Sequence, residues 1–560
     1  MPRLAPTVAA LAAAALLIAG CSSPSEETAP SPEPDPEPTE TDEPTEEPTE
    51  DDDGGDAEDE DDDPEALLNQ YGISAGHPLA TAAGEEIFEQ GGNAVDAVIA
   101  AAFAVAVVEP FASGIGGGGS AIVVPAEDDA RAYDYREVVA NTGVIPAGGA
   151  GVPGFVAGMG ELHEQYGELD WADVLAPAIT LAEDGFEVSP FLSLRMGSDY
   201  GPEAIAGLEH FAPGGQALDA GDLLVQQDLA RTMATIAEEG PEAFYTGSLS
   251  SDLTTIDGFD AESLADYEVV TSDPVRGAVG DHEVLGPAPP LPGVSLIQML
   301  QIAEAGGLAD AEPGSAAFIE LIGEGWSAGY DTAMTVLGDP AFVDVPIDEL
   351  TDAQTNAGLA GGAAPIPSFG PPEPGEAGNT THLTAVDADG LLISMTNTIT
   401  AFWGSEYYVG GYFLNDQLTR FDAVGTTAAN EPEAGKRSVS WSLPAVVVDQ
   451  EGRAVLGIGT PGAQRIPQVL AQVISRWGMH GQPLEEVIAA PRFSYEDGEL
   501  LMEADPPDDV AAQLSTGYEV IPPEWAYFGS VQALEVDYDT GEITGPADER
   551  REAAVAIGEP

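Results

Sequence analysis

Residues 94–108 constrain the fold more than any other part of the sequence, because they are apolar almost all round. They read AVDAVIAAAFAVAVV, follow Asn93, a residue suited to a helix N-terminus, and precede Glu109-Pro110, which ends a helix. A helix without a polar face has to be covered on every side, so we expect it inside the core. The run is too short to span a bilayer, and Asp96 within it also argues against a membrane span.

The patterns around this helix predict a mixed fold in which hairpins contribute to the sheet. A β-hairpin is predicted from two runs rich in β-branched and apolar residues, 381–386 and 391–398, on either side of the turn 387–390. Further helices are predicted at 77–90, 155–165, 171–184, 226–239, 465–477 and 484–490, and further strands at 121–124, 445–448, 454–458 and 531–537. Residues 361–379, rich in Gly, Ala and Pro, are predicted to form a loop.

The N-terminus is typical of an export signal. Arg3 precedes an Ala/Leu-rich run over residues 5–19, which is too short for a membrane span and suits a signal peptide. The run ends in Ile18-Ala19-Gly20-Cys21-Ser22, which resembles a bacterial lipoprotein box, where the chain is cut before a cysteine that then carries lipid. Cys21 is the only cysteine of the chain, so an intramolecular disulfide is impossible. We therefore predict a signal peptide over residues 1–21 and lipid on Cys21; the alternative is an ordinary secretory signal with an incidental cysteine.

Residues 22–65 are predicted to be a disordered tether between this anchor and the folded body. Between residues 22 and 64 there are 21 acidic residues and no Lys or Arg. Such a segment repels itself and has too little apolar surface to offset the entropy lost on folding. The whole chain has a formal net charge of −84, which argues against a nucleic-acid partner and against electrostatic docking on anionic lipid. We expect membrane contact through the lipid anchor only, on the outer face of the cell membrane, and a salty habitat that screens the charge.

A glycine-rich run at residues 113–120, SGIGGGGS, invites comparison with a nucleotide-binding loop. No P-loop lysine follows it, and it leads into the predicted strand 121–124 rather than into a helix. We therefore expect no nucleotide there. The six histidines show no zinc-like spacing, so no metal or other cofactor is expected, and His382 is interpreted as structural.

Two threonines meet at the open end of the predicted hairpin. Pairing outward from the turn places Thr380 opposite Asn397 or Ile399, depending on which two residues form the loop, so Thr398 lies within one residue of Thr380. A threonine that follows a flexible loop and has a fixed hydroxyl partner suits an N-terminal nucleophile, whose own freed α-amine acts as the base. The alternative is that threonine is simply a favourable strand residue.

The residues around Thr380 resemble the processing site of the γ-glutamyltransferases, also called glutathione hydrolases, in the Ntn-hydrolase superfamily. The resemblance rests on Asn379-Thr380-Thr381-His382, the turn 387–390 and Ser394-Met395-Thr396-Asn397-Thr398. It extends in order along the body through motifs at 91–97, 109–119, 134–137, 152–154, 171–186, 459–463, 528–532 and 548–551.

The resemblance implies a role for individual residues. Thr380 matches the self-processing nucleophile, Thr398 its hydroxyl partner, and Arg136 the arginine that holds the donor's α-carboxylate. Gly462 and Ala463 match the pair whose backbone N–H groups form the oxyanion hole. Gln417 and Ser440 match positions that bind the donor. Self-cleavage is expected between Asn379 and Thr380.

Three positions depart from the family pattern. Thr400 stands where the transferases have an asparagine, Trp441 follows Ser440 where they have a second serine, and Arg420 replaces an aspartate that pairs with the donor's α-ammonium. The segment 421–436 also looks shorter than the lid loop of some members. We therefore expect Thr400 and Arg420 to contribute to a donor site with altered specificity.

The resemblance implies an α/β (α+β) fold, a four-layer αββα sandwich made of two fragments of one precursor. These are a large fragment, 66–379, and a small fragment, 380–560, which together form an intramolecular heterodimer. The family default is a γ-glutamyltransferase or hydrolase acting on glutathione-type donors, with water or an amino acid as acceptor. The alternatives are an amidase acting on poly-γ-glutamate or another carboxyacyl amide, and a self-processed scaffold without activity.

Overall fold

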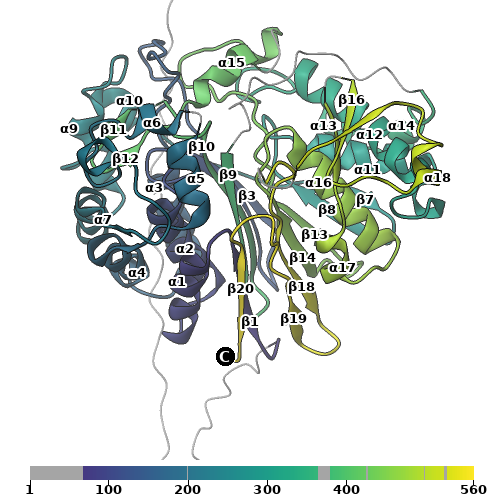
Figure 1. The fold of residues 1–560 in the computed structure, drawn as a ribbon, viewed down its shortest axis with the longest axis horizontal. Helices are drawn as coiled ribbons and strands as arrows, with labels where there is room; N and C mark the ends of the chain where they lie inside the picture. The colour runs from purple at the N-terminus through teal and green to yellow at the C-terminus, as the bar shows by residue number, and fades with distance from the viewer. Residues whose placement is uncertain are drawn as a thin grey trace, which may run out of the picture. The chain divides into compact units, whose positions relative to one another are not determined.

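Two β-sheets lie face to face in the centre of the molecule, and helices cover the outer face of each (Figure 1). The computed structural model describes residues 67–198, 200–362, 379–405, 407–423, 427–496, 498–522 and 526–560. The predicted signal peptide, Cys21, the acidic tether and most of the predicted loop before Asn379 lie outside these ranges. The four layers confirm the predicted αββα architecture.

The first sheet carries the predicted hairpin at its centre. Val386 pairs with Leu392 and Asn397 with Thr381, and the N–H of Asp387 donates to the carbonyl of Leu391 across the turn. Every neighbouring pair in this sheet is antiparallel. In spatial order its strands are β20 (Ala554–Gly558), β1 (Tyr71–Ala75), β9 (Asn379–Val386), β10 (Leu392–Thr400), β2 (Gly118–Val124), β3 (Arg131–Asp134) and β6 (Val270–Ser272).

The second sheet packs against the first through apolar side chains and close glycine contacts. Leu392 and Val386 of the first sheet share a buried cluster with Val446 and Leu534 of the second. A Cβ on Gly457 would lie 2.6 Å from the methyl of Thr384, so a glycine is needed for the sheets to approach this closely. In spatial order the strands are β19 (Glu542–Thr544), β18 (Gln532–Asp537), β14 (Ala454–Gly459), β13 (Ala445–Val448), β8 (His282–Gly286) and β7 (Val275–Val279).

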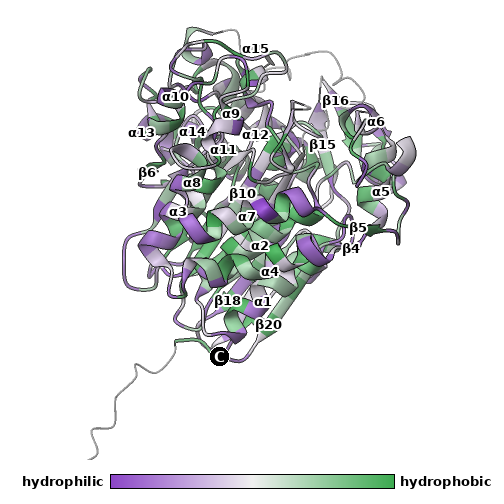
Figure 2. Cartoon of the chain, turned by 90° about the vertical axis from the view of Figure 1, so that its left-hand side faces the viewer, coloured by the Kyte–Doolittle hydropathy of each residue, from purple (hydrophilic) through white to green (hydrophobic). Residues whose placement is uncertain are grey.

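The apolar helix α2 (Ala94–Val108) covers the first sheet and is buried along its whole length, as predicted. Asn93 caps it by accepting from the N–H groups of Val95 and Asp96, while Asp96 accepts from the N–H of Asn93. In Figure 2 the hydrophobic colour of α2 lies among its neighbouring helices. The other main helices of this layer are α1 (Pro78–Glu89), α3 (Phe155–Tyr166), α4 (Trp171–Asp184) and α7 (Gln227–Glu239).

A second helical layer covers the other sheet. The predicted helix at 465–477 is α16 (Arg465–Ile474), which continues as a π-helical turn over Ser475–Met479, and the one at 484–490 is α17 (Leu484–Ala489). The sequence analysis did not predict α11 (Gly293–Ala305) and α12 (Ala316–Thr335), which pack on each other and, through α11, on β7 and β8. Both are largely buried, so their amphipathic signal is weak.

No helix among the described residues is long and apolar enough to cross a membrane.

Short elements connect these layers. The short strands are β4 (Phe186–Glu187), β5 (Leu223–Leu224), β11 (Tyr408–Val409), β12 (Tyr412–Phe413), β15 (Phe493–Glu496), β16 (Glu499–Met502) and β17 (Tyr518–Val520). The short helices are α5 (Pro190–Gly197), α6 (Gly201–Ala204), α8 (Glu242–Tyr245), α9 (Ser250–Leu253), α10 (Ala261–Ala265), α13 (Ile347–Leu350), α14 (Ala353–Ala357), α15 (Arg420–Ala423) and α18 (Asp508–Ala511).

Candidate active site

Thr380 and Thr398 face each other at the open end of the β9–β10 hairpin. The strand pairing shifts between Asn397 and Thr400, so that Thr398 and Ile399 together oppose Thr380 in a β-bulge. The two threonine Oγ1 atoms are 3.4 Å apart, and their residues are only 5% and 3% exposed. The predicted proximity of the two threonines is confirmed, and the bulge turns Thr398 toward Thr380 while Ile399 enters the helical core.

The two sheets bring most of the predicted site residues into one cavity, which we call the threonine pocket. Strands β9 and β13 begin at the same edge at which β10 and β14 end, so side chains from both sheets meet there. The cavity is small, about 10 Å³, with room for about one water molecule. Its lining residues are Thr380, Thr398, Thr400, Gln417, Arg420, Ser440, Trp441, Ser442 and Ala463.

A chain of hydrogen bonds holds one side of the threonine pocket in place. This side, which we call the hydroxyl wall, consists of Thr398, Thr400 and Gln417. The N–H of Thr400 donates to Oγ1 of Thr398 at 2.8 Å, and the Thr400 hydroxyl donates to Oε1 of Gln417. Gln417 in turn donates from Nε2 to the hydroxyl of Ser438 at 2.9 Å. Thr400 has a φ of 83°, a left-handed conformation that is unusual for a β-branched residue and is common at functional sites. Thr398 Oγ1 therefore accepts both the Thr400 N–H and the hydroxyl proton of Thr380, so the oxygen of Thr380 keeps its lone pairs free of this contact.

Gly462 and Ala463 form a tight turn immediately before α16. Their φ angles are 143° and 53°, so both residues have positive φ. Their carbonyls accept the N–H groups of Arg465 and Ile466, whereas neither of their own N–H groups has an acceptor within the described chain. Ala463 lines the threonine pocket, and Gly462 lies one residue behind it. Two N–H groups beside a helix N-terminus form an arrangement that can stabilise a developing oxyanion.

Arg136 does not line the threonine pocket. Its Nε and Nη2 donate to the two carboxylate oxygens of Asp134 at 2.9 and 2.6 Å, and its Nη1 donates to the carbonyl of Ser438. Burial alone would raise the pKa of Asp134, but Arg136 and Arg437 lower it below its usual value. The guanidinium predicted to bind a donor carboxylate is therefore already paired, and it reaches the pocket wall only through Ser438. To bind a donor, Arg136 would have to share or leave Asp134.

Of the described residues that line the threonine pocket, Arg420 is the only charged one. Asp416 and Asp422 lie close to Arg420 in the sequence and are acids that could bind a donor ammonium in its place. Asp416 is half-buried, lies outside the described lining residues and accepts the N–H of Ala401 at 2.8 Å. Burial raises the pKa of Asp416 to about 6, although the Ala401 N–H and the charge of Arg420 lower it. The side chain of Asp422 lies outside the described residues.

Trp441 and His382 both have well-packed structural surroundings. Trp441 stacks on Tyr330 with ring centroids 5.9 Å apart and contacts Trp326, so aromatic packing fixes the position where the transferases have a second serine. His382 is fully buried between the sheets, and its ring nitrogens contact the hydroxyls of Thr396 and Thr384. Burial lowers its pKa to about 3, so the ring is neutral at ordinary pH.

Behind Thr380 lie two charged residues to which the sequence analysis assigned no role. Nη1 of Arg551 donates to the carbonyl oxygen of Thr380 at 3.5 Å. Glu109, at the end of α2, accepts the hydroxyl proton of Thr381 at 3.0 Å. Both residues belong to the sequence motifs 109–119 and 548–551, but sequence spacing gives no sign that they meet behind Thr380.

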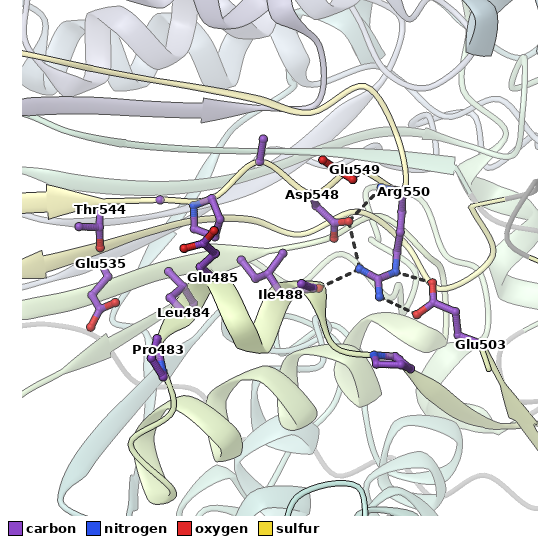
Figure 3. A pocket seen from close by; sticks show the side chains of 15 residues that line it. Pro483, Leu484, Glu485, Ile488, Glu503, Glu535, Thr544, Asp548, Glu549 and Arg550 are labelled. Carbon is purple, nitrogen blue, oxygen red and sulfur yellow. Dashed lines mark hydrogen bonds and ion pairs between the residues drawn. The ribbon is translucent and has the colours of Figure 1, made fainter. Parts of the chain in front are cut away.

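A much larger cavity, which we call the α17 cavity, lies beside α17 (Figure 3). Its volume is about 1250 Å³. Arg550 lies at one end of it and donates to Glu503, to Asp548 and to the carbonyl of Ile488. Its lining residues are Pro483, Leu484, Glu485, Ile488, Ala489, Pro491, Glu503, Glu535, Thr544, Gly545, Pro546, Ala547, Asp548, Glu549 and Arg550. None of the predicted catalytic residues lines it.

With this geometry in view, comparison with known sequences identifies the family. The sequence model described as Gamma-glutamyltranspeptidase matches residues 80–558. The chain belongs to the gamma-glutamyltranspeptidase family. It is 35% identical to the capsule biosynthesis protein CapD proenzyme of Bacillus anthracis, over 86% of this chain and 89% of that protein. It is 33% identical to the acylase ACY 1 proenzyme of Pseudomonas sp. strain SE83, over 85% of this chain and 91% of that protein. It is 30% identical to the glutathione hydrolase proenzyme of Bacillus subtilis strain 168, over 87% of this chain and 91% of that protein.

Solved structures support the same fold. The cephalosporin acylase from Bacillus halodurans superposes with a TM-score of 0.77 over 87% of this chain and 96% of that one, at 24% identity. Similarity at this level of identity demonstrates a shared architecture and nothing about the substrate. The chain is thus an Ntn-hydrolase of the gamma-glutamyltranspeptidase family and an enzyme. The relatives named above include a capsule biosynthesis protein, an acylase and a glutathione hydrolase, each described as a proenzyme.

Proposed function

We propose that the chain cuts itself between Asn379 and Thr380 and then uses Thr380 as the nucleophile of γ-glutamyl amide hydrolysis and transfer. The observation that carries the proposal is that Thr380, Thr398 and Ala463 line one buried pocket. In the first step Thr380 Oγ1 attacks the Asn379 carbonyl carbon, and the peptide nitrogen leaves as the α-amine. Water then hydrolyses the resulting ester and frees the carboxylate of Asn379 and the hydroxyl of Thr380.

In each later turnover the freed amine serves as base for its own hydroxyl. Thr380 Oγ1 attacks the γ-carbonyl carbon of the donor, its proton passes to the α-amine, and the amide nitrogen leaves with that proton. The negative charge that develops on the carbonyl oxygen is stabilised by the N–H groups of Gly462 and Ala463. Water attacks the γ-glutamyl ester to give hydrolysis, and an amino acid attacks it to give transpeptidation.

The donor is a γ-glutamyl compound whose α-amine is already acylated, as in an internal residue of poly-γ-glutamate. Arg420 supports this choice, because it lines the pocket with a positive charge that attracts a carboxylate and repels a free α-ammonium. Glutathione, the donor of the family default, carries that ammonium and is the poorer substrate on this account. Arg136 lies outside the pocket lining and affects the donor site indirectly, by donating to the carbonyl of Ser438.

The self-cleavage is tested on purified protein. Mass spectrometry of the two expected pieces should give one fragment ending at Asn379 and one beginning at Thr380. Intact protein that still turns over a γ-glutamyl anilide would contradict the mechanism. For the donor, kcat/KM is compared between glutathione and N-acetylglutathione, and we expect the acetylated compound to be better by about tenfold. Release of short fragments from poly-γ-glutamate would support the polymer as substrate.

We also propose that the enzyme is exported and tethered by lipid on Cys21 to the outer face of the cell membrane. The support is the sequence Ile18–Cys21 followed by the acidic segment 22–65. Cys21→Ser should move the protein from the detergent phase to the aqueous phase when cells are extracted. Equal partitioning of Cys21→Ser and wild type would contradict the anchor.

A further inference from the structure

Arg551 brings a positive charge close to the backbone of the nucleophile. Its Nη1 donates to the carbonyl oxygen of Thr380 at 3.5 Å, and its guanidinium lies 5.1 Å from the centre of the Phe191 ring. Burial is the main cause that lowers the pKa of Arg551 to about 10, so the side chain stays charged at neutral pH. The nitrogen of Thr380 is three bonds from that carbonyl oxygen, so the charge lies within roughly 7 Å of it.

Among the described residues, Glu109 is the acid that most raises the pKa of Arg551, and it is only partly ionised near neutrality. Its carboxylate is buried at the end of α2 and accepts the hydroxyl proton of Thr381. Burial raises the pKa of Glu109 to about 7, although Arg551 and the Thr381 hydroxyl lower it. Around pH 7 the carboxyl therefore offsets the charge of Arg551 only in part.

The neighbouring residues hold Arg551 in place. Arg550 donates to both carboxylate oxygens of Glu503 and to Asp548 (Figure 3). Asp548 is bound at the same time by Nη2 of Arg492 at 2.6 Å and by the N–H of Val531. This network anchors the backbone one residue before Arg551 and so fixes the position from which its side chain reaches Thr380.

We propose that Arg551 is a positioning residue that keeps the freed α-amine of Thr380 in its neutral, proton-accepting form, and that Glu109 moderates this effect. The inference rests on the proposed self-cleavage, which creates that amine. An ordinary α-amino group has a pKa of about 7.7–8.0 and is mostly protonated at pH 7, when it cannot act as a base. A fixed positive charge nearby disfavours the ammonium and lowers the pKa.

The other ionisable groups around this pair come from several elements, and each has a charged or hydrogen-bonding neighbour. His382, two residues along β9, is neutral at ordinary pH, as described above. The charged groups are Arg465 paired with Glu496, Asp548 paired with Arg492, Glu552 near Glu109, and Arg420 across the pocket near Asp416. Arg551 is the cation whose contact with Thr380 is direct, so its removal should have the largest effect on the amine.

The test is the pH dependence of kcat/KM for wild type, Arg551→Gln, Arg551→Lys and Glu109→Gln, each first examined on a gel for cleavage. Arg551→Gln should move the acidic limb of the profile up by about one pH unit, a tenfold rise in the proton affinity of the amine. Arg551→Lys should keep the limb near its wild-type position. Glu109→Gln should move it down by a few tenths of a unit, because the offsetting charge is lost. Arg231→Gln, which removes an exposed arginine on α7, is the matched control and should change nothing.

The outcomes separate this inference from the proposed function. An uncut wild type contradicts the self-cleavage itself. A cut and active Arg551→Gln enzyme whose acidic limb stays where it was overturns the inference, even if kcat falls, because a merely structural role lowers the rate without moving the limb. If Arg551→Gln remains uncut, Glu109→Gln decides: a downward shift of its limb supports the inference, and an unmoved limb overturns it.

Discussion

The threonine pocket and the α17 cavity have opposite characters. The first has about 10 Å³ of space, one charged lining residue and a wall of hydroxyl and amide groups. The second has about 1250 Å³, and charged residues contribute much of its lining. Size alone would favour the second as the site of function. The chemistry favours the first, since it combines the proposed nucleophile, a hydroxyl partner and N–H groups that have no acceptor among the described residues, in a place where electrostatic stabilisation is strong.

Buried polar groups have different roles in the two regions. In the threonine pocket the hydroxyls are bonded so that Thr380 still has a reacting oxygen to offer. Beside α17, Arg492, Asp548, Arg550 and Glu503 satisfy one another, and Arg492 and Asp548 have almost no exposure. We infer that the first region carries the chemistry and that the second holds the C-terminal segment in place.

The largest effect that separates the two regions is expected for Thr380→Ala. The variant lacks the attacking oxygen, so it should stay one piece on a denaturing gel and lose more than about 1000-fold in kcat/KM. Thr544→Ala removes a hydroxyl from the lining of the α17 cavity and is the matched control, with normal cleavage and activity. If Thr544→Ala abolished activity as well, the functional division between the two regions would be wrong.

Asp548→Asn should affect stability. Burial alone would raise the pKa of Asp548, but Arg492 and Arg550 lower it, so the charged form is the stabilising one. Losing the charge leaves Arg492 buried without a counter-ion, which costs roughly 3–5 kcal/mol in the free energy of unfolding. The midpoint of thermal unfolding measures this loss. Because the folded pKa is depressed, the contribution of Asp548 is present above its unfolded pKa of about 3.9 and is lost as the pH falls through the folded value.

Glu485→Gln is the control for that experiment, since Glu485 lines the same cavity but is exposed. It should leave the unfolding midpoint unchanged. A loss as large as that of Asp548→Asn would mean that the cavity lining as a whole, and not the buried ion pairs, carries the stability.

Thr398→Ala should slow catalysis without preventing folding. The change removes the hydroxyl 3.4 Å from Thr380 Oγ1 and leaves a buried donor without this partner, which costs roughly 1–3 kcal/mol, or about 5- to 150-fold in kcat. Thr398→Ser keeps the hydroxyl and should recover most of the rate. If the serine variant were as slow as the alanine variant, the methyl group rather than the hydroxyl would be what matters.

How far the sequence predicted this site depends on whether a feature is local. The hairpin and the meeting of Thr380 with Thr398 followed from strand periodicity and the short turn predicted at 387–390, both of which are local. The β-bulge was not predicted, because pairing rules allow either neighbouring register and the choice depends on packing against α2. The family motifs identified most lining residues, since their spacing is a property of the chain.

Side-chain directions and long-range contacts could not be predicted in this way. Arg136 was expected to be available for a donor, yet it is paired with Asp134, two residues earlier, and sequence patterns do not reveal which way a side chain points. Arg551 is 171 residues from Thr380 along the chain and reaches it because β20 and β9 both pair with β1. Helices α11 and α12 went unpredicted because burial on most sides removes the polar stripe on which periodicity depends.

The smallest expected effect concerns the single charge of the threonine pocket. Arg420→Asp would restore the charge sign that the transferases have at this position, so a free α-ammonium should be attracted and an acylated donor no longer favoured. Replacing a repelling charge by an attracting one at the same distance changes the interaction energy by twice the Coulomb energy of a single pair. Solvent and side-chain relaxation reduce this difference. Even about 1.4 kcal/mol of surviving difference changes the ratio of kcat/KM for glutathione and N-acetylglutathione tenfold. Arg420→Gln removes the charge without reversing it and should fall between wild type and Arg420→Asp. If all three enzymes gave the same ratio, Arg420 would not contact the donor, and the pocket would owe its selectivity to its hydroxyl wall alone.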